Sequence, residues 1–330
     1  MFNTPKFWHK KGFLAFLFIP FSVIYFLIKR VFTAFEKPSQ KFNFTTIFVG
    51  NPIAGGSGKT PSVAAIAKLV RENYPQKKLC VISKGYGGSI IEPEILDVAK
   101  HTAEEAGDEP LILAKYADVI IAKNRFKACA FAAEKNYEIT IFDDGMHDNR
   151  IEKDLCIMVI DGKYGFGNGL VFPAGPLRDR LDIATKNTTH TLLIGRDEKN
   201  IIQRLEKRSL KTPIIKASVS SLTSPDKKQS YIAFAGLARP EKFFDMLKIN
   251  MGLNIAETID FPDHYNYDNG DLNYIKSLAE SYKAKILTTE KDYVKLPELF
   301  QKEVEAIKIE LKFEDDKMLE ILEKTISDKG

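Results

Sequence analysis

The chain is poor in cysteine and carries little net charge. Its 330 residues include only three cysteines, Cys80, Cys129 and Cys156, and they lie far apart. This spacing fits neither a disulfide framework nor a zinc site, so we expect buried thiols in a reducing compartment. The formal net charge is +4, which does not indicate the concentrated basic face of a nucleic-acid binder. With 44% hydrophobic and 28% charged residues, a folded chain of two domains is predicted.

One segment departs from this soluble composition. Residues 12–28 read GFLAFLFIPFSVIYFLI, without a charge, and basic residues flank the run on both sides. At about 1.5 Å per residue the run falls slightly short of a hydrocarbon core of roughly 30 Å, and Pro20 interrupts it. No small-residue cleavage site follows. We therefore predict a membrane-associated helix within residues 1–35, spanning the bilayer or lying in its interface, over a core-packed helix or a signal peptide.

The rest of the chain alternates between apolar strand-like runs and amphipathic helical runs. FNFTTIFVG is followed by a glycine-rich loop and by SVAAIAKLVREN, and KLCVISKGYGG, YEITIFDDG, LCIMVIDG and TLLIG continue the pattern. Such alternation predicts an α/β fold: a P-loop NTPase-like, mostly parallel sheet with helices on both faces. The polar stretch between residues 200 and 230 marks a junction. We expect a core at 36–225 and a smaller C-terminal α/β domain at 226–330.

The glycine-rich loop VGNPIAGGSGKTP has the context of a phosphate-binding loop, between a strand and a helix. The glycine that usually opens such a loop is absent, since Ile53 stands six residues before Lys59. The backbone N–H groups around the later glycines can still converge on phosphate oxygens at the helix start. Lys59 supplies a cation for the outer phosphates and the Thr60 hydroxyl a ligand for Mg²⁺. The predicted nucleotide-binding residues are Ile53, Ala54, Gly55, Gly56, Ser57, Gly58, Lys59 and Thr60.

Acidic residues and one histidine are candidates for the remaining chemistry. The strand ITIF ends in Asp143 and Asp144, which are predicted to hold Mg²⁺ with Thr60, although strand ends also carry aspartate for solvation alone. Asp108 begins a helix in the motif GDEP, where capping alone would explain an acid. His264 lies in the loop FPDHYNY; a lone loop histidine is more often structural, but a kinase that acts on a hydroxyl needs a base.

A long glycine- and proline-rich loop, GNGLVFPAGPLRDR, presents Arg178 and Arg180. Arginine forks suit phosphate recognition, and surface ion pairing is the simpler alternative.

Several motifs in succession resemble one family, the tetraacyldisaccharide 4′-kinases (lipid A 4′-kinases) of Gram-negative bacteria. They are VGNPIAGGSGKTP, SKGYGG, AGDEP, FDDGMHD, GNGLVFPAGPLRD, FAGLARPEKFF, FPDHYNY and TTEKDYVKL. The resemblance implies transfer of the γ-phosphate of ATP, with Mg²⁺, to the 4′-hydroxyl of an acylated glucosamine disaccharide 1-phosphate. The enzyme is expected to act at the cytoplasmic face of the inner membrane. The sequence gives no sign of a nucleic-acid or protein partner.

The resemblance also implies a catalytic pair, in which His264 takes the proton of the 4′-hydroxyl and Asp108 orients the imidazole. Candidates for contacts with the substrate phosphates are Lys84, Arg125, Arg178, Arg180 and Arg239.

The sequence departs from the family at two places. Lys84 stands in SKGYGG where the family usually has arginine, which replaces a bidentate contact by a point charge. The family's DDGFQH appears as DDGMHD, so that His147 takes the place of glutamine and Asp148 that of histidine. Any role of that Gln–His pair does not transfer to this chain.

Two other classes share some of these features. A nucleotide-switch GTPase would also carry the phosphate loop, but its guanine-selecting Asn/Thr-Lys-x-Asp motif is not found in the sequence. A membrane-tethered ATPase that moves a partner would explain the N-terminal segment and the loop. It gives no reason for His264 or for the acidic GDEP motif.

Overall fold

The computed structural model describes residues 5–35, 39–186, 188–208, 210 and 212–329. Its larger sheet has nine strands in the order β13-β8-β7-β6-β1-β5-β2-β4-β3. All neighbouring strands are parallel except the pairs β3–β4 and β13–β8. The strands are β1 (Thr45–Gly50), β2 (Leu79–Ser83), β3 (Glu94–Ile95), β4 (Asp118–Ile121), β5 (Ile139–Asp143), β6 (Leu155–Asp161), β7 (His190–Ile194), β8 (Ile214–Ser221) and β13 (Ile309–Phe313).

The central strands are buried on both faces, as expected of a parallel sheet between two helix layers. In β1, Ile47 and Val49 pack into one core while Phe48 packs into the other. The first core is covered by α3 (Lys59–Asn73), α4 (Ala103–Ala106), α5 (Asp108–Leu113) and α13 (Lys317–Ser327). The second is covered by α6 (Arg125–Glu134), α7 (Leu181–Ala184) and α8 (Ile201–Glu206). This confirms the predicted fold class.

A smaller parallel sheet forms the second domain, with strand order β10-β9-β11-β12. Its strands are β9 (Ser230–Gly236), β10 (Asn254–Phe261), β11 (Lys285–Thr289) and β12 (Val304–Ile307). Helix α10 (Asn269–Ser281) packs on one face; α9 (Pro240–Asp245) and the π-helix η2 (Met246–Asn250) pack on the other. The short helices α11 (Glu290–Tyr293) and α12 (Glu298–Gln301) follow β11.

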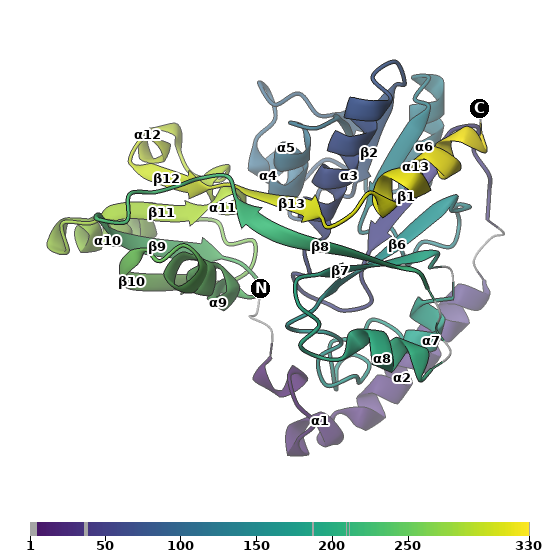
Figure 1. Cartoon of the computed structure of the whole chain (residues 1–330), viewed down its shortest axis with the longest axis horizontal. Helices are drawn as coiled ribbons and strands as arrows, with labels where there is room; N and C mark the ends of the chain where they lie inside the picture. Colours follow the sequence, from purple (N-terminus) through teal and green to yellow (C-terminus); the bar gives the residue numbers. More distant parts are fainter. Residues whose placement is uncertain (1–4, 36–38, 187, 209, 211, 330) are drawn as a thin grey trace.

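The end of the chain does not stay in the second domain. Strand β13 pairs antiparallel with β8, and Leu311, Met318 and Leu322 enter the core of the larger sheet. Figure 1 shows β8 and β13 side by side at one edge of the larger sheet, with α13 returning to the α3 side of that sheet. The expected segment 226–330 therefore needs a correction, because its last strand and helix complete the first domain.

The N-terminal apolar segment forms two consecutive helices, preceded by a 3₁₀ turn, η1 (Lys6–Trp8), rather than the one helix expected. Helix α1 (Phe13–Leu17) ends before Phe18, and α2 (Ile19–Ala34) begins with Pro20 in its first turn, where proline is tolerated. Among the described residues no helix is both long and apolar enough to cross a membrane. Figure 1 shows α1 and α2 along the side of the larger domain near α7 and α8.

Polar contacts fix these helices on the glycine- and proline-rich loop. The Ser22 hydroxyl donates to the carbonyl of Val171 at 2.8 Å, and Lys29 forms a 2.8 Å ion pair with Asp179. The opposite side of the segment is left apolar and exposed, with Phe13, Phe32 and Phe35 more than two-thirds accessible to solvent.

Candidate active site

The phosphate loop lies between β1 and α3. The helix N-cap, Gly58, has a φ of 86°, and Gly55 has a φ of 100°, values that L-residues rarely adopt. A Cβ at Gly58 would also stand 2.7 Å from Cδ1 of Ile194. The loop conformation therefore depends on Gly55 and Gly58, so the missing early glycine is not needed.

The charged end of the loop is held by a residue that the motif analysis did not single out. Lys59 Nζ lies 3.4 Å from Oδ1 of the buried Asn51 and 3.9 Å from Oδ1 of Asp144. Asn51 also hydrogen-bonds the Ser57 hydroxyl. Thr60 lies in the first turn of α3. The segment from residue 51 to residue 60 thus forms one connected cradle at the positive end of a helix.

The two aspartates after β5 lie next to this cradle, because Val49 of β1 is in register with Asp143. Burial raises the pKa of Asp143, and the charges of Glu109 and Asp144 add to the rise. Burial opposes ionisation of Asp144 too, but Lys59 and Arg178 outweigh it and hold the pKa of Asp144 well below its usual range.

Oδ1 of each of these aspartates is buried without a hydrogen-bond partner among the described residues. Paired carboxylate oxygens with free lone pairs suit a hard cation such as Mg²⁺, which takes one or two carboxylates and completes its shell with water and phosphate oxygens. No cluster of three or more histidine, cysteine or acidic residues that could hold a metal occurs in the described parts of the chain.

Two of the predicted arginines reach this site. Arg178 Nη1 donates to Asp144 Oδ2 at 2.9 Å, and its loop pairs with the phosphate loop through a bridge between Ile53 and Leu177. The buried Arg125 donates from Nη2 to the carbonyl oxygens of Asp143 and Asp144, at 2.9 and 2.7 Å. In this structure Arg125 therefore fixes the backbone that carries the two aspartates.

The other three predicted cations form no ion pair with Asp143 or Asp144 among the described residues. Arg180 forms an exposed ion pair with Asp182 at 3.0 Å. For Arg180 the structure therefore shows surface ion pairing, the alternative to phosphate recognition. Arg239 is buried 3.5 Å from Asp161 and stacks on the Tyr164 ring, with Nη2 unpartnered among the described residues. Lys84 follows β2 and its side chain is exposed overall, but partial loss of water around the ammonium and the charge of the nearby Arg125 lower its pKa.

Asp108 and His264, which are 156 residues apart in the sequence, meet between the two domains. His264 Nδ1 donates to Asp108 Oδ2 at 3.0 Å, and the backbone N–H of Glu109 donates to Asp108 Oδ1 at 2.8 Å. Gly107 has a φ of 86° and approaches the Tyr86 carbonyl so closely that a Cβ would lie 2.7 Å from its oxygen. This contact seats α5 against the SKGYGG turn, and the Tyr86 ring lies 4.9 Å from that of His264.

The loop that carries His264 is anchored by Asp292, which is fully buried. Asp292 accepts hydrogen bonds from the Tyr267 hydroxyl at 2.9 Å and from the backbone N–H of Gly236 at 3.0 Å, and it forms a 2.8 Å ion pair with Lys295. Removal of one partner from a buried ion pair is costly, so this network holds the histidine loop rigidly beside β9. His264 itself has a φ of 57°, which the surrounding contacts maintain.

Burial opposes ionisation of Asp108, but the hydrogen bond from His264 and the charge of Lys291 outweigh it and hold the pKa of Asp108 below its usual value. A cavity of about 290 Å³ opens on the pair. Its lining also includes Tyr86, Glu104, Asn266 and Lys295. An ionised carboxylate behind an imidazole, both facing a cavity, is the arrangement of a general base.

Two of the changed residues of the DDGMHD motif, His147 and Asp148, take separate structural roles. His147 Nε2 lies 3.0 Å from the carbonyl oxygen of Asn51, and burial with the nearby Arg178 and Lys29 lowers its pKa to about 4. His147 is therefore neutral near pH 7 and supports the phosphate loop. Asp148 accepts two hydrogen bonds from Arg150, of 2.9 and 2.7 Å. Its carboxylate is thus held in an ion pair and does not take over the role of the histidine that the family has at this position.

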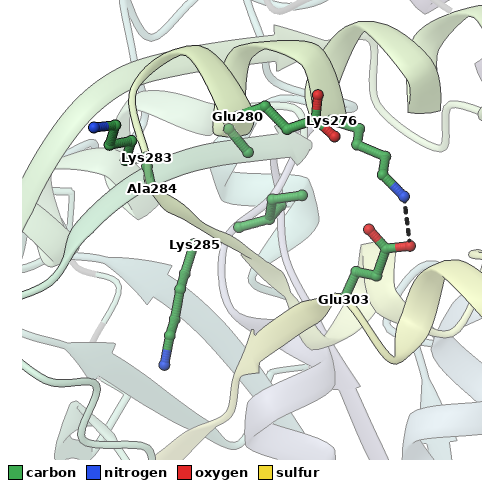
Figure 2. Close-up of a pocket in the computed structure, with 8 residues that line it drawn as sticks. Lys276, Glu280, Lys283, Ala284, Lys285 and Glu303 are labelled. Carbon is green, nitrogen blue, oxygen red and sulfur yellow. Dashed lines mark hydrogen bonds and ion pairs between the residues drawn. The ribbon is translucent and has the colours of Figure 1, made fainter.

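A second cavity, of about 330 Å³, lies in the small domain beside α10 and β11. Figure 2 shows Lys276 and Glu303 joined across one side of it, by a 2.8 Å ion pair, while the side chains of Lys283 and Lys285 extend away from that pair. None of the predicted site residues lines it.

Comparison with known proteins decides the family. Residues 14–327 match the model of the tetraacyldisaccharide-1-P 4′-kinase family. The chain belongs to this kinase family. A tetraacyldisaccharide 4′-kinase of Rhodospirillum rubrum is 34% identical over 329 residues, covering 97% of this chain and 96% of the relative. That of Rickettsia canadensis is 35% identical, covering 96% and 94%.

A solved structure agrees with this membership. The Aquifex aeolicus LpxK crystal structure, an "apo" form in complex with ATP, aligns with a TM-score of 0.73 at 27% identity and covers 95% of this chain and 100% of that one. The resemblance to the tetraacyldisaccharide 4′-kinases is thus confirmed along almost the whole chain. Asn51, Lys291 and Asp292, which hold or support predicted site residues, were not singled out from the sequence. The motif TTEKDYVKL, which contains two of them, was the available signal.

Proposed function

We propose that this chain transfers the γ-phosphate of ATP to the 4′-hydroxyl of a tetraacyldisaccharide 1-phosphate and so forms lipid IVA in lipid A biosynthesis. The observation that carries the proposal is the Asp108–His264 pair at 3.0 Å. The pair lies near the nucleotide side, because Glu109, next to Asp108, is close enough to Asp143 for its charge to raise the pKa of Asp143. Family membership and the names of the relatives supply the acceptor.

The nucleotide side uses the cradle of residues 53–60. Its glycines allow the backbone N–H groups to approach phosphate oxygens, and Lys59 neutralises charge on the outer phosphates. Mg²⁺, when bound, would be held by Asp143, Asp144 and Thr60 and would offset the phosphate charge. Arg178, which is 2.9 Å from Asp144, is the arginine best placed to face a phosphate.

The acceptor side uses the pair at the 290 Å³ cavity. His264 takes the proton of the 4′-hydroxyl at Nε2, because Nδ1 donates to Asp108. Asp108 fixes the ring and stabilises the imidazolium that forms, as a carboxylate does behind a histidine base. Tyr86, in contact with the His264 ring, can pack against a sugar face.

The test compares ATP turnover with and without the acceptor lipid. We expect phosphate transfer that depends on a tetraacyldisaccharide 1-phosphate, with little hydrolysis in its absence. A membrane-tethered ATPase would instead hydrolyse ATP at the same rate without acceptor. Vigorous acceptor-free hydrolysis together with an unmodified lipid would therefore refute the proposed reaction.

We also propose that α1 and α2 hold the enzyme at the cytoplasmic surface of the inner membrane. The supporting observation is a row of exposed apolar residues on the side that does not contact the protein. These residues include Phe13, Phe21, Ile24, Ile28, Val31, Phe32 and Phe35. An apolar face with basic flanks is typical of a helix that lies in the interface of an anionic bilayer.

The prediction is a loss of membrane partition in the double variant Phe13→Ser/Phe32→Ser. Each phenylalanine contributes about 1.5–3 kcal/mol when it leaves water, so vesicle binding should weaken by roughly 100-fold or more. Co-sedimentation with vesicles that contain anionic lipid measures this. Leu299→Ser is the matched control, since Leu299 is equally exposed at 79% but lies on α12. Equal binding of the double variant and the control would show that other surfaces hold the enzyme.

A further inference from the structure

Lys291 joins residues of both domains at one point. It is the second residue of α11, and its Nζ lies 3.2 Å from His264 Nε2, 3.2 Å from Asp263 Oδ1 and 3.6 Å from Glu109 Oε1. Asp108 Oδ2 is 4.0 Å away. The side chain is largely buried, with 16% exposed. One ammonium group therefore contacts the catalytic histidine and three carboxylates.

This environment keeps the ammonium charged. Burial opposes the charge, but Glu109, Asp108 and Asp263 outweigh it and raise the pKa of Lys291 above its usual value. The other groups near His264 are Lys295, which is paired with Asp292, and the Tyr86 ring. A charged lysine has three donors and no acceptor. The contact with His264 Nε2 therefore requires a lone pair on that nitrogen.

The ring is thus held from both sides in a single tautomer. Nδ1 carries the hydrogen and donates it to Asp108 Oδ2 at 3.0 Å, while Nε2 accepts from Lys291. This is the tautomer that a base acting at Nε2 needs. The ammonium also stands where the acceptor hydroxyl must come, within reach of Asp263 and Glu109 as alternative partners.

We propose, on the basis of the proposed function, that Lys291 is a positioning residue for the transfer. Its ammonium holds His264 in the tautomer with an unprotonated Nε2, and it moves onto Asp263 and Glu109 when the acceptor hydroxyl takes its place at Nε2. A purely structural ion pair between the domains would contribute to stability alone, without selecting a tautomer.

The first test reads the tautomer directly, without substrates. Histidine labelled with ¹⁵N in the full chain in detergent gives different shifts for protonated and unprotonated ring nitrogens, and His264→Gln identifies the signal. The wild type should show Nδ1–H and an unprotonated Nε2, and Lys291→Met a measurably smaller share of this tautomer, because Asp108 alone then selects it. A wild-type signal from Nε2–H would overturn the proposal without any variant, and it would also count against His264 Nε2 as the base. Phosphate transfer to the acceptor lipid is measured independently, so failure of this proposal and failure of the proposed reaction are distinguishable.

The second test separates positioning from stability. Lys291→Met should lower kcat by about 10²-fold through a displaced base, with KM for ATP changed little, and Lys291→Arg should restore part of it. Lys115→Met is the control, because Lys115 pairs with Glu290 of the same helix but is 48% exposed. Melting temperatures show whether each variant is folded. An unchanged kcat and tautomer in a folded Lys291→Met protein would refute the positioning role.

Discussion

Replacement of either member of the proposed catalytic pair, Asp108 and His264, should nearly abolish transfer. Asp108→Ala and His264→Ala are each expected to lower kcat by about 10²–10⁴-fold, the usual contribution of a positioned general base. Without His264 the hydroxyl keeps its proton, and without Asp108 the ring loses the acceptor at 3.0 Å that fixes its tautomer. ATP should still bind, because neither residue belongs to the phosphate loop. Single-turnover kinetics and nucleotide binding measure the two effects separately.

The control for this prediction is His190→Ala. His190 is the first residue of β7, at the opposite end of the parallel strands from the phosphate loop. Its loss should therefore leave kcat within about 2-fold. The double variant Asp108→Ala/His264→Ala should be little slower than either single variant, since the two residues act as a unit. Near-normal transfer by one single variant would remove that residue from the mechanism.

Loss of Lys59 should be comparably severe but of a different kind. Lys59→Met removes the cation that stands 3.9 Å from Asp144 and that we propose to face the outer phosphates. Preorganised charges of this type contribute about 10²–10³-fold or more to phosphoryl transfer. Both nucleotide affinity and kcat should fall, which distinguishes this variant from the Asp108 and His264 variants. Isothermal titration with ATP and transfer assays measure the two quantities.

Lys68→Met is a matched control on the same helix. Lys68 lies on the exposed side of α3, where its ion pair with Glu310 should contribute little. Its loss should change neither binding nor transfer noticeably. Undiminished ATP affinity in Lys59→Met would argue that residues 53–60 do not form the nucleotide site.

The nucleotide side could be predicted from the sequence because each of its parts directly follows a strand of the parallel sheet. A parallel sheet brings the ends of its strands to one edge, so a glycine-rich loop after β1 and two aspartates after β5 become neighbours whatever the details. The loop glycines were predictable for the same reason, since backbone conformation limits the residue type.

The pair of Asp108 and His264 was not predictable by such reasoning. Its members belong to different domains and meet only through the packing of α5 against the loop after β10. Each residue alone had an ordinary explanation, as a helix cap or a loop histidine. Resemblance to a family supplied the pairing, and the structure places the two residues at hydrogen-bonding distance.

One wrong assignment and one omission have physical causes. Strand β13 was assigned to the second domain because a sequence pattern predicts a strand but not its partner, and the nearest sheet in the chain was assumed. No role for Lys291 was predicted from the sequence. Its burial against His264 depends on a 3.2 Å approach that no local pattern encodes.

Mass spectrometry of the acceptor is the most direct test of the central claim. The full chain, purified in detergent, is incubated with Mg-ATP and a tetraacyldisaccharide 1-phosphate, with the Asp108→Ala/His264→Ala protein as a blank. The account predicts that the lipid gains one phosphate, at the 4′ position, in the wild type alone. An unmodified lipid after ATP has been consumed, or a chain that does not bind ATP at all, would contradict it.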